Sequence, residues 1–463
     1  MFDKTTYIRR RETLRKSLGS GLILLPGNDE SPMNYADNPF PFRQDSTFLY
    51  FFGLSQPSLA GVLDCDAGED WIFGDDLTVE DFVWMGPQPS LAESARRPGV
   101  SNTAPAASLP ALLKKASGQG RRIHFLPPYR PENMIKLFRW LGIRPEDAKA
   151  GASVDLIYGV ANQRNRKSAE EVEEIRKAVN ISVDMHTLAM RMAKPGASEL
   201  EITAAVHRLA LAAGAQLAFP IIATINGQTL HNHHHENLLK AGGMFLLDAG
   251  AETALGYAGD LSSTVPVSGK FTARQRDIYD LCLASHNAAI GMLKPGLPFK
   301  EAHFEAARIL IRGFQGLGLM KGNVEDALAH GAHALFFPCG LGHLMGLDVH
   351  DMEDLGEVYV GYGGEPKSTQ FGLKSLRLGR KLESGFVLTI EPGIYFIPEL
   401  IDQWRADGRN AEYINYDKLE AYRTFGGLRN EENFLITGEG HELLGRPKPK
   451  IAADVEAEWA KGL

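Results

Sequence analysis

Residues 336–351 read FFPCGLGHLMGLDVHD, and the rest of the fold is best predicted outward from this stretch. Two histidines, His343 and His350, stand seven positions apart among three glycines and an otherwise apolar run. Because glycine allows close backbone approach, a polar side chain here can point inward rather than toward solvent. The spacing G-x-G-x-x-x-G is one residue too long for a dinucleotide-binding fingerprint. We therefore predict that His343 binds a metal whose other ligands lie elsewhere in the chain.

The composition is that of an ordinary globular protein. The chain of 463 residues, 44% hydrophobic and 23% charged, is long enough for two or three domains. A net charge of −8 argues against nucleic acid or an anionic membrane as partner. The N-terminus has no apolar signal region, no apolar run reaches the roughly 20 residues of a membrane span, and three scattered cysteines do not suggest a disulfide framework. The expected location is the cytoplasm.

Two domains are predicted, with residues 1–160 forming an α/β N-terminal domain and residues 161–463 the second. The boundary is placed near residues 159–166, just before a capping box that opens a long helix. In the first domain, the aromatic residues that end at Gly53 are expected to form a core strand. The polar residues before them, Arg43–Ser46, are either a binding surface or the turn that leads into this strand.

The second domain contains an internal repetition. A helix pattern ends at Met192-Ala193-Lys194-Pro195-Gly196, and another helix follows. About a hundred residues later the pattern recurs around Met292-Leu293-Lys294-Pro295-Gly296. Each copy is a helix, a Lys-Pro-Gly turn and a helix, followed by strand-like sequence. We interpret this as a duplicated ααβ unit whose two halves form a cleft where ligands from both can meet.

Carboxylates recur at the ends of apolar strands in the second domain. Asp248 ends one such strand, and Asp260 follows a glycine-bearing turn. Glu391 comes before a Pro-Gly turn, and Glu431 lies two residues after Arg429 in a fourth strand. A carboxylate at the end of a buried strand is costly to desolvate unless it is paired or bound to metal. One strand-end aspartate is explained by a turn cap, but the whole series indicates a shared cation site.

Together with His343, these acids form an oxygen-rich donor set. Such a set suits Mn²⁺, Co²⁺, Fe²⁺ or Zn²⁺. Its size is high for a single ion and appropriate for two ions, which bridging carboxylates hold about 3.5–4 Å apart. The predicted metal ligands are Asp248, Asp260, His343, Glu391 and Glu431.

This ordered set, with each residue in its own strand context, resembles the pita-bread metallopeptidases, and within them the Xaa-Pro branch of aminopeptidase P and prolidase. The resemblance covers about residues 160–445. Residues 42–46 also resemble the N-terminal domain that precedes the catalytic domain in this branch. The implied fold class is α+β: a C-terminal pita-bread (creatinase/aminopeptidase-like) domain with an internal ααβ pseudo-twofold duplication, preceded by a smaller α/β domain. The stretches that carry the resemblance are Leu247–Gly250, Gly340–Asp351, Thr389–Tyr395 and Gly427–Glu432.

The resemblance implies a di-metal Xaa-Pro aminopeptidase. Such an enzyme hydrolyses the bond between an N-terminal residue and a following proline, by attack of a hydroxide that bridges two divalent metal ions. Mn is the first expectation for the metal, with Co, Fe or Zn as alternatives. By resemblance, Asp248 would hold one ion and His343 and Glu391 the other, while Asp260 and Glu431 would bridge. Glu391 would also handle the proton.

Further residues match positions that the family uses on its substrate. His231 and His350 match histidines that contact substrate and stabilise the tetrahedral intermediate. Arg429 matches a residue that orients Glu431 or substrate, and Tyr395 is expected in the substrate site. By contrast, the adjacent run of residues 233–235, all histidine, is expected to be a solvated loop, although a histidine cluster can bind metal adventitiously.

Two features depart from the family pattern or extend it. Cys339 stands where the family usually has a histidine, and a thiol is a weak hydrogen-bond partner. One substrate contact is therefore expected to be lost or replaced. Residues 355–382 form a long glycine-bearing insertion that is expected to shape the rim of the cleft.

Two other functions stay open at this point. Prolidase acts on Xaa-Pro dipeptides alone, and the sequence does not decide between it and aminopeptidase P. A pita-bread module without catalysis is the more distant alternative, although such modules lose metal ligands and this chain has all five. The expected partners are proline-containing peptides, and the resemblance also implies a homodimer or homotetramer.

Overall fold

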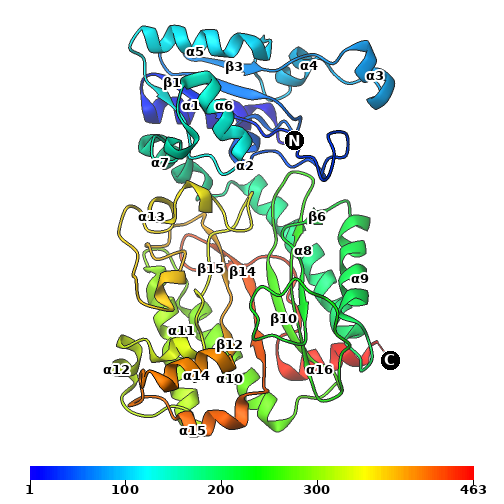
Figure 1. The fold of residues 1–463 in the computed structure, drawn as a ribbon, viewed down its shortest axis with the longest axis vertical. Helices are drawn as coiled ribbons and strands as arrows, with labels where there is room; N and C mark the ends of the chain where they lie inside the picture. Colours follow the sequence, from blue (N-terminus) through cyan, green and yellow to red (C-terminus); the bar gives the residue numbers. More distant parts are fainter. Residues whose placement is uncertain (463) are drawn as a thin grey trace. The chain divides into compact units, whose positions relative to one another are not determined.

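The computed structural model describes residues 1–462 and contains two compact units of mixed helices and strands (Figure 1). The first unit comprises residues 1–164 and 352–360, and the second comprises residues 165–351 and 361–463. The expected α+β fold class is confirmed. Among the described residues, no helix is long and apolar enough to cross a membrane.

The first unit is built on a five-stranded sheet in the order β4-β3-β2-β1-β5. Its strands are β1 (Leu22–Pro26), β2 (Ala60–Asp64), β3 (Glu69–Phe73), β4 (Asn102–Ala104) and β5 (Ile123–His124). The β1–β2 and β2–β3 pairs are antiparallel, whereas β1–β5 and β3–β4 are parallel. A buried apolar cluster joins this sheet to helices α5 and α6. The helices of the unit are α1 (Lys4–Leu18), α2 (Ser46–Phe52), α3 (Val79–Met85), α4 (Leu91–Arg96), α5 (Leu109–Gly118), α6 (Pro131–Leu141), α7 (Val154–Arg164) and α13 (Glu357–Val360).

One prediction for the first unit is wrong: the aromatic run before Gly53 is the helix α2 and not a strand. The Asp45 carboxylate caps this helix by accepting a hydrogen bond of 2.8 Å from the Phe48 backbone N–H. Because an N-terminal cap satisfies donors that a helix start otherwise leaves open, it outweighs the strand preference of the aromatic residues. The Arg43–Ser46 group is therefore the entrance to a helix.

The second unit has two pairs of long helices. In the first pair, one apolar face of α8 is buried, with Ile175 and Val179 at 0% and 1% exposure. A capping box of Ser198 and Glu201 opens α9. The helices of the unit are α8 (Ala169–Met192), α9 (Glu199–Ala212), α10 (Ala273–Met292), α11 (Phe299–Gly316), α12 (Val324–Ala329), α14 (Pro398–Ala406), α15 (Tyr416–Leu419) and α16 (Ala452–Ala460).

The two Lys-Pro-Gly turns have the same local geometry. Gly196 and Gly296 adopt left-handed φ values of 86° and 84°, which glycine reaches at little cost. The N–H of each glycine donates over 2.8 Å to a leucine carbonyl far along the chain, Leu239 in one case and Leu382 in the other. This equivalence supports the predicted duplication.

The strands of the second unit form short antiparallel sheets. Strand β8 lies between β10 and β7 in one sheet, and β14 lies between β11 and β15 in another. Strand β10 also packs against β13 and β14, which brings the two halves of the unit together (Figure 1). The strands are β6 (Gln216–Leu217), β7 (Ile222–Thr224), β8 (Met244–Ala249), β9 (Ala251–Glu252), β10 (Leu261–Pro266), β11 (Val387–Ile390), β12 (Gly393–Tyr395), β13 (Gly427–Arg429), β14 (Glu432–Ile436) and β15 (His441–Leu443).

Candidate metal centre

The four predicted carboxylates lie at strand ends that meet inside the second unit. Asp248 is in the central strand β8, where it pairs with Ser262 of β10. Asp260 directly precedes β10, and Glu431 directly precedes β14. The Glu431 N–H donates to the Ser262 carbonyl over 3.2 Å, which links the two halves next to these carboxylates. Glu391 directly follows β11.

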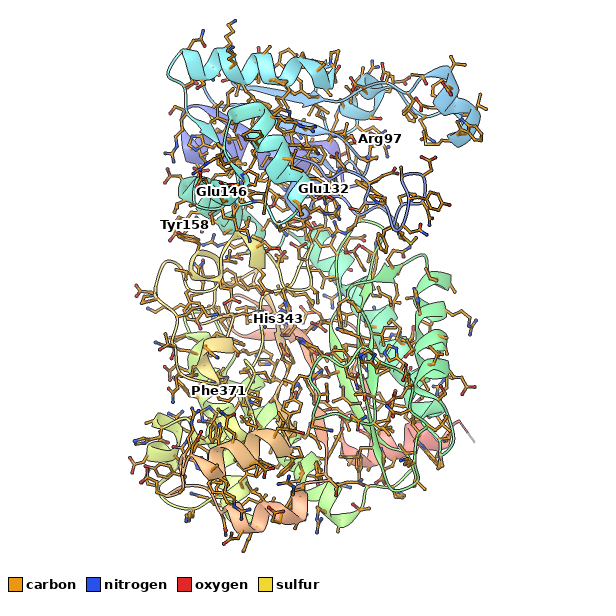
Figure 2. The ribbon with its side chains drawn as sticks, in the orientation of Figure 1. Arg97, Glu132, Glu146, Tyr158, His343 and Phe371 are labelled. Carbon is orange, nitrogen blue, oxygen red and sulfur yellow. The ribbon has the colours of Figure 1, made fainter. Side chains whose placement is uncertain are left out.

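His343 is held beside β11 by a reciprocal pair of hydrogen bonds. Its N–H donates to the Thr389 hydroxyl over 3.1 Å, and the Thr389 N–H donates to its carbonyl over 3.0 Å. The approach requires glycine at position 342, because a Cβ there would lie 2.0 Å from the Thr389 carbonyl oxygen. Figure 2 shows His343 in the interior of the unit, and its side chain is 4% exposed.

The imidazole of His343 is oriented for coordination through Nε2. Its Nδ1 lies 3.0 Å from the Leu344 carbonyl oxygen, so Nδ1 carries the proton that this bond requires. Nε2 then faces Asp260 Oδ2 at 3.3 Å and Glu391 Oε1 at 3.4 Å. An imidazole with one nitrogen bonded to a carbonyl and the other aimed at carboxylates is the usual arrangement of a metal-ligating histidine.

Three of the five predicted ligands form a compact cluster. One ligand atom from each of Asp260, His343 and Glu431 lies within 4.8 Å of the others. Asp248 adds a further observation, because its Oδ1 is buried and has no hydrogen-bond partner. A buried carboxylate oxygen is costly to leave unsatisfied. The donor set and this oxygen both fit divalent cations.

Burial and mutual repulsion raise the pKa values of the carboxyls in this cluster. Burial is the main cause for Asp260 and Glu431, whose pKa values lie well above the ordinary range, and each also feels the charge of neighbouring carboxylates. The pKa of Asp248 is raised by burial as well, although Arg429 acts in the opposite direction. Without bound cations, these carboxyls therefore hold protons more readily than exposed carboxyls do.

Arg429 connects the two halves of the centre. Its guanidinium donates to Asp248 Oδ2, to Ser262 Oγ over 2.8 Å and to Tyr395 Oη over 2.7 Å. Ser262 Oγ in turn donates to Glu431 Oε2 over 2.8 Å. One planar cation thus fixes two of the predicted ligands at once, Asp248 directly and Glu431 through the serine.

The other predicted substrate residues lie around this centre. The ring of His350 meets that of His343 edge to face, with centroids 4.2 Å apart. The pKa of His231 is lowered, first by partial burial and then by the charge of Arg429. The pKa of the Cys339 thiol is raised to about 12, by burial and by the charge of Glu391, so the thiol is neutral at physiological pH.

The histidine run at residues 233–235 does not join the centre. His233 and His234 are exposed, and His235 Nε2 lies 3.1 Å from the Ile221 carbonyl oxygen. Within residues 1–462, the one group of three or more metal-binding side chains close enough to share an ion is that of Asp260, His343 and Glu431.

Sequence reasoning missed Asn433 and Ser262. The side-chain amide of Asn433 clamps the backbone of Asp260, accepting from its N–H over 3.1 Å and donating to its carbonyl over 2.6 Å. Ser262 lies between Arg429 and Glu431, as described above. Their positions in the sequence gave a signal, because each lies two residues after a predicted ligand. In a strand, residues two apart lie on the same face, so both side chains could be expected beside a ligand.

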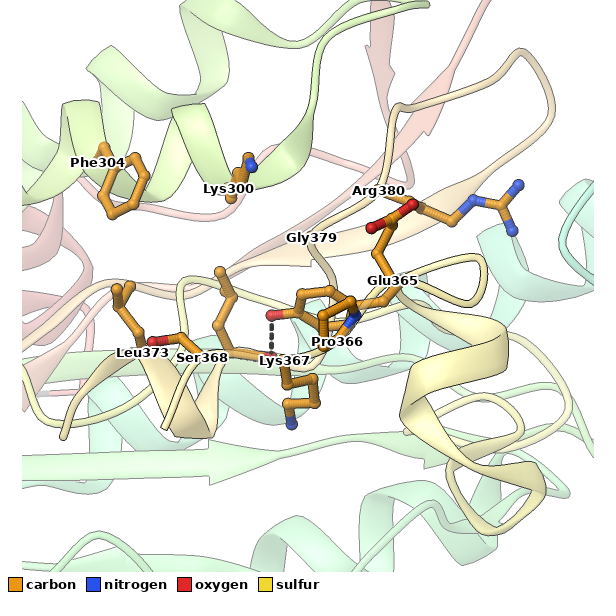
Figure 3. A pocket seen from close by; sticks show the side chains of 11 residues that line it. Lys300, Phe304, Glu365, Pro366, Lys367, Ser368, Leu373, Gly379 and Arg380 are labelled. Carbon is orange, nitrogen blue, oxygen red and sulfur yellow. Dashed lines mark hydrogen bonds between the residues drawn. The ribbon is translucent and has the colours of Figure 1, made fainter. Parts of the chain in front are cut away.

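The predicted insertion borders a separate cavity of about 510 Å³ (Figure 3). Lys300 and Phe304 of α11 face residues 362–380 across it. None of the five predicted ligands lines this cavity. Its wall residue Leu376 packs on Gly340, where a Cβ would lie 2.9 Å from the Leu376 Cα. The lining of the cavity thus touches the segment that leads to His343 without including a predicted ligand.

Comparisons with known proteins agree with this geometry. Residues 173–438 match the family described as Metallopeptidase family M24, and residues 7–124 match the Aminopeptidase P, N-terminal domain. The chain is 30% identical to Xaa-Pro dipeptidase from Homo sapiens, over 96% of this chain and 90% of that protein. It is 32% identical to Xaa-Pro aminopeptidase from Escherichia coli K12, over 98% and 97% of the two chains. The solved structure of Pseudomonas aeruginosa aminopeptidase PepP is similar, with 28% identity, a TM-score of 0.81 and coverage of 100% and 99%.

Proposed function

The chain belongs to metallopeptidase family M24, and we propose that it is a di-metal Xaa-Pro aminopeptidase, which removes an N-terminal residue that precedes proline. The observation that carries this proposal is the buried Asp248 Oδ1 without a partner, beside the cluster of Asp260, His343 and Glu431. A set of four carboxylates and one imidazole suits Mn²⁺ first, with Co²⁺, Fe²⁺ and Zn²⁺ as alternatives.

In this proposal Asp248 would hold one ion and His343 and Glu391 the other, with Asp260 and Glu431 shared between them. Ions held there would supply a water of lowered pKa and a polarised substrate carbonyl. Glu391 is the most exposed of the four carboxylates, with 21% of its side chain accessible, which suits it to carry a proton between water and the leaving nitrogen.

The two histidines act on the substrate carbonyl. His350 touches the His343 ring, and His231 lies within reach of the charges of Asp248 and Arg429. Both can donate a hydrogen bond where negative charge develops on the carbonyl oxygen. Arg429 and Tyr395 keep Asp248 in place, and the neutral Cys339 leaves that part of the wall weakly polar.

Metal analysis and peptide hydrolysis test the proposal together. We expect the purified protein to bind two divalent ions and to release the first residue of an Xaa-Pro-Yaa peptide, with activity lost in chelator and restored by Mn²⁺. His343→Ala should lose both properties. His234→Ala, in the exposed histidine run, is the matched control and should keep both. Protein that is loaded with metal but inactive on Xaa-Pro-Yaa and on Xaa-Pro would refute the proposed function.

A second candidate is a dipeptidase specific for Xaa-Pro, and Arg377 is the observation that favours it. The pKa of His231 is lowered first by burial and also by the charges of Arg429 and Arg377, so both guanidinium groups act on this imidazole. A guanidinium there can bind the free carboxylate of a dipeptide, as paired N–H donors match carboxylate oxygens.

Comparing an Xaa-Pro dipeptide with its Xaa-Pro-Yaa extension decides between the two candidates. An aminopeptidase cleaves the tripeptide at least as well as the dipeptide. A dipeptidase prefers the dipeptide, and Arg377→Met then raises KM for the dipeptide at least tenfold. Lys374→Met, an exposed cation in the same insertion, serves as the control for general charge loss.

We also propose that the protein is a homo-oligomer, assembled through α3. This short helix has no buried residue, and its side chains include Val83 at 75% and Trp84 at 81% exposure. Exposed apolar surface of this kind marks an interaction site. Light scattering should give a mass of two or four chains, and the double variant Val83→Ser/Trp84→Ser should give a smaller species.

A further inference from the structure

A buried ion pair includes the residue that follows His350 in the chain. Lys167 Nζ and Asp351 Oδ2 are 2.8 Å apart, and each side chain is 1% exposed. Asp351 is the residue that follows His350, whereas Lys167 comes from the segment that precedes α8. The pair therefore ties the end of the 344–351 loop to a distant part of the same unit.

The surroundings of the pair are built to hold it. The Lys167 N–H donates to the Gly385 carbonyl over 2.8 Å, and the Asp351 N–H donates to the Leu344 carbonyl over 2.9 Å. Gly346 lies against the pair, where a Cβ would be 2.6 Å from Asp351 Oδ2 and 2.9 Å from Lys167 Cε. Both backbone and side chain of Asp351 are thus fixed, and the loop packs on the pair without room for a larger residue.

His350 depends on this anchor for its position. The bond from Asp351 N–H to Leu344 closes the loop that separates His343 from His350, and the imidazoles then meet edge to face. After Asp351 the chain leaves the second unit, and Met352 has a left-handed φ of 60°. Asp351 is the one residue between His350 and this exit, so a fixed Asp351 limits how far the backbone of His350 can move.

We propose that Lys167 is a positioning residue for the peptidase reaction, acting through Asp351 to place the His350 imidazole at the carbonyl oxygen. The inference rests on the proposed function, because it assumes that His350 acts in the reaction. A displacement of about 1 Å in a catalytic group can reduce the rate about 100-fold. Lys167→Met should therefore lower kcat about 10- to 100-fold with less than a threefold change in KM.

A double-mutant cycle with His350→Ala separates positioning from general structure. If Lys167 acts through His350, then Lys167→Met lowers kcat in the wild-type background but has no further effect in His350→Ala. Equal fold-losses in the two backgrounds would overturn the inference.

Two measurements protect the test from trivial failure. The bound metal and the thermal midpoint of unfolding are measured for each variant. If Lys167→Met does not fold, it is replaced by Asp351→Asn, which keeps the size of the side chain. Asp351→Asn should also lower kcat in the wild-type background and have no further effect in His350→Ala. Arg166→Met is the matched control. Arg166 directly precedes Lys167 in the chain but forms a surface ion pair with Glu383, so its replacement should leave kcat unchanged. Wild-type protein inactive on both peptide classes would overturn the proposed function, whereas an active wild type with background-independent losses would overturn the positioning role alone.

Discussion

Replacing Asn433 by leucine should weaken the metal centre without touching any metal ligand. Asn433 is fully buried, and its amide makes two hydrogen bonds to the backbone of Asp260, of 3.1 Å and 2.6 Å. Leucine is similar in size and can make neither bond. The Asp260 N–H and carbonyl would then stay buried without these partners, while every side chain predicted to bind metal would remain in place.

The expected size of the effect follows from the two lost bonds. A buried backbone group left unsatisfied costs about 1–3 kcal/mol, so the two groups together cost about 2–6 kcal/mol of folding free energy. Residues that support a metal ligand typically change metal affinity by about 10- to 100-fold. We therefore expect Asn433→Leu to bind Mn²⁺ about 10- to 100-fold more weakly and to unfold at lower urea concentration.

Urea unfolding of the metal-free protein and calorimetric titration with Mn²⁺ measure the two effects separately. Asn415→Leu is the matched control, because the Asn415 amide also holds a backbone carbonyl, that of Gly318 at 3.1 Å, in a segment that contains none of the predicted ligands. It should lose stability but keep its metal affinity. If Asn433→Leu lost only stability and bound Mn²⁺ as tightly as the wild type, the argument that the amide positions Asp260 for metal would be wrong.

Further predictions concern charge. Arg429→Lys keeps the charge but not the forked guanidinium that reaches Asp248 and Tyr395. We expect kcat/KM for an Xaa-Pro substrate to fall about 100-fold, which corresponds to a loss of about 3 kcal/mol from a buried ion pair. An unchanged kcat/KM would contradict the role of these hydrogen bonds. Metal binding should release protons, because burial raises the pKa values of the carboxyls, and calorimetry in two buffers of different ionisation enthalpy would show a heat that depends on the buffer. Burial lowers the pKa of His303 from 6.5 to about 3 and that of His333 from 6.5 to about 4. Between the folded-state pKa and 6.5, each histidine binds a proton in the unfolded chain but not in the folded one. Stability is therefore lost as the pH falls below about 6.5, by up to about 1.4 kcal/mol per pH unit for each histidine. Urea midpoints at pH 7 and pH 5 should therefore differ less for His303→Leu than for the wild type, and an equal difference would refute this assignment.

The strand-end carboxylates could be predicted from sequence because their context is unusual. An acid that ends an apolar strand, as Asp248 does, is costly to bury unless it caps a turn, pairs with a cation or binds a metal. The series with His343 and Glu431 favours metal binding among these explanations. The sequence contains no comparable signal for Asn433 or Ser262. Amide and hydroxyl side chains are common in strands and turns, and their roles depend on which backbone groups folding brings within 3 Å.

The helix α2 shows where local pattern fails. Its residues Ser46–Phe52 are mostly aromatic, and aromatic residues favour strands when only the pattern is considered. Asp45 caps the helix that forms instead, and such a cap contributes about 1 kcal/mol. By contrast, local pattern does indicate the start of α9, because the spacing from Ser198 to Glu201 is that of a capping box and apolar residues follow it.

Charge balance supports the proposal that this centre holds two cations rather than one. Arg429 is the cation hydrogen-bonded within the set of four carboxylates, and these five groups together carry three net negative charges when all the acids are ionised. One divalent ion would leave a net charge of −1 in a buried site, and a hydroxide nucleophile would make it −2. Two divalent ions with one hydroxide bring the sum to zero, the state in which burial penalises the site least. Arg429 cannot substitute for the second ion, because its fork already engages Asp248 Oδ2, Ser262 and Tyr395, while Asp248 Oδ1 is left for a further cation.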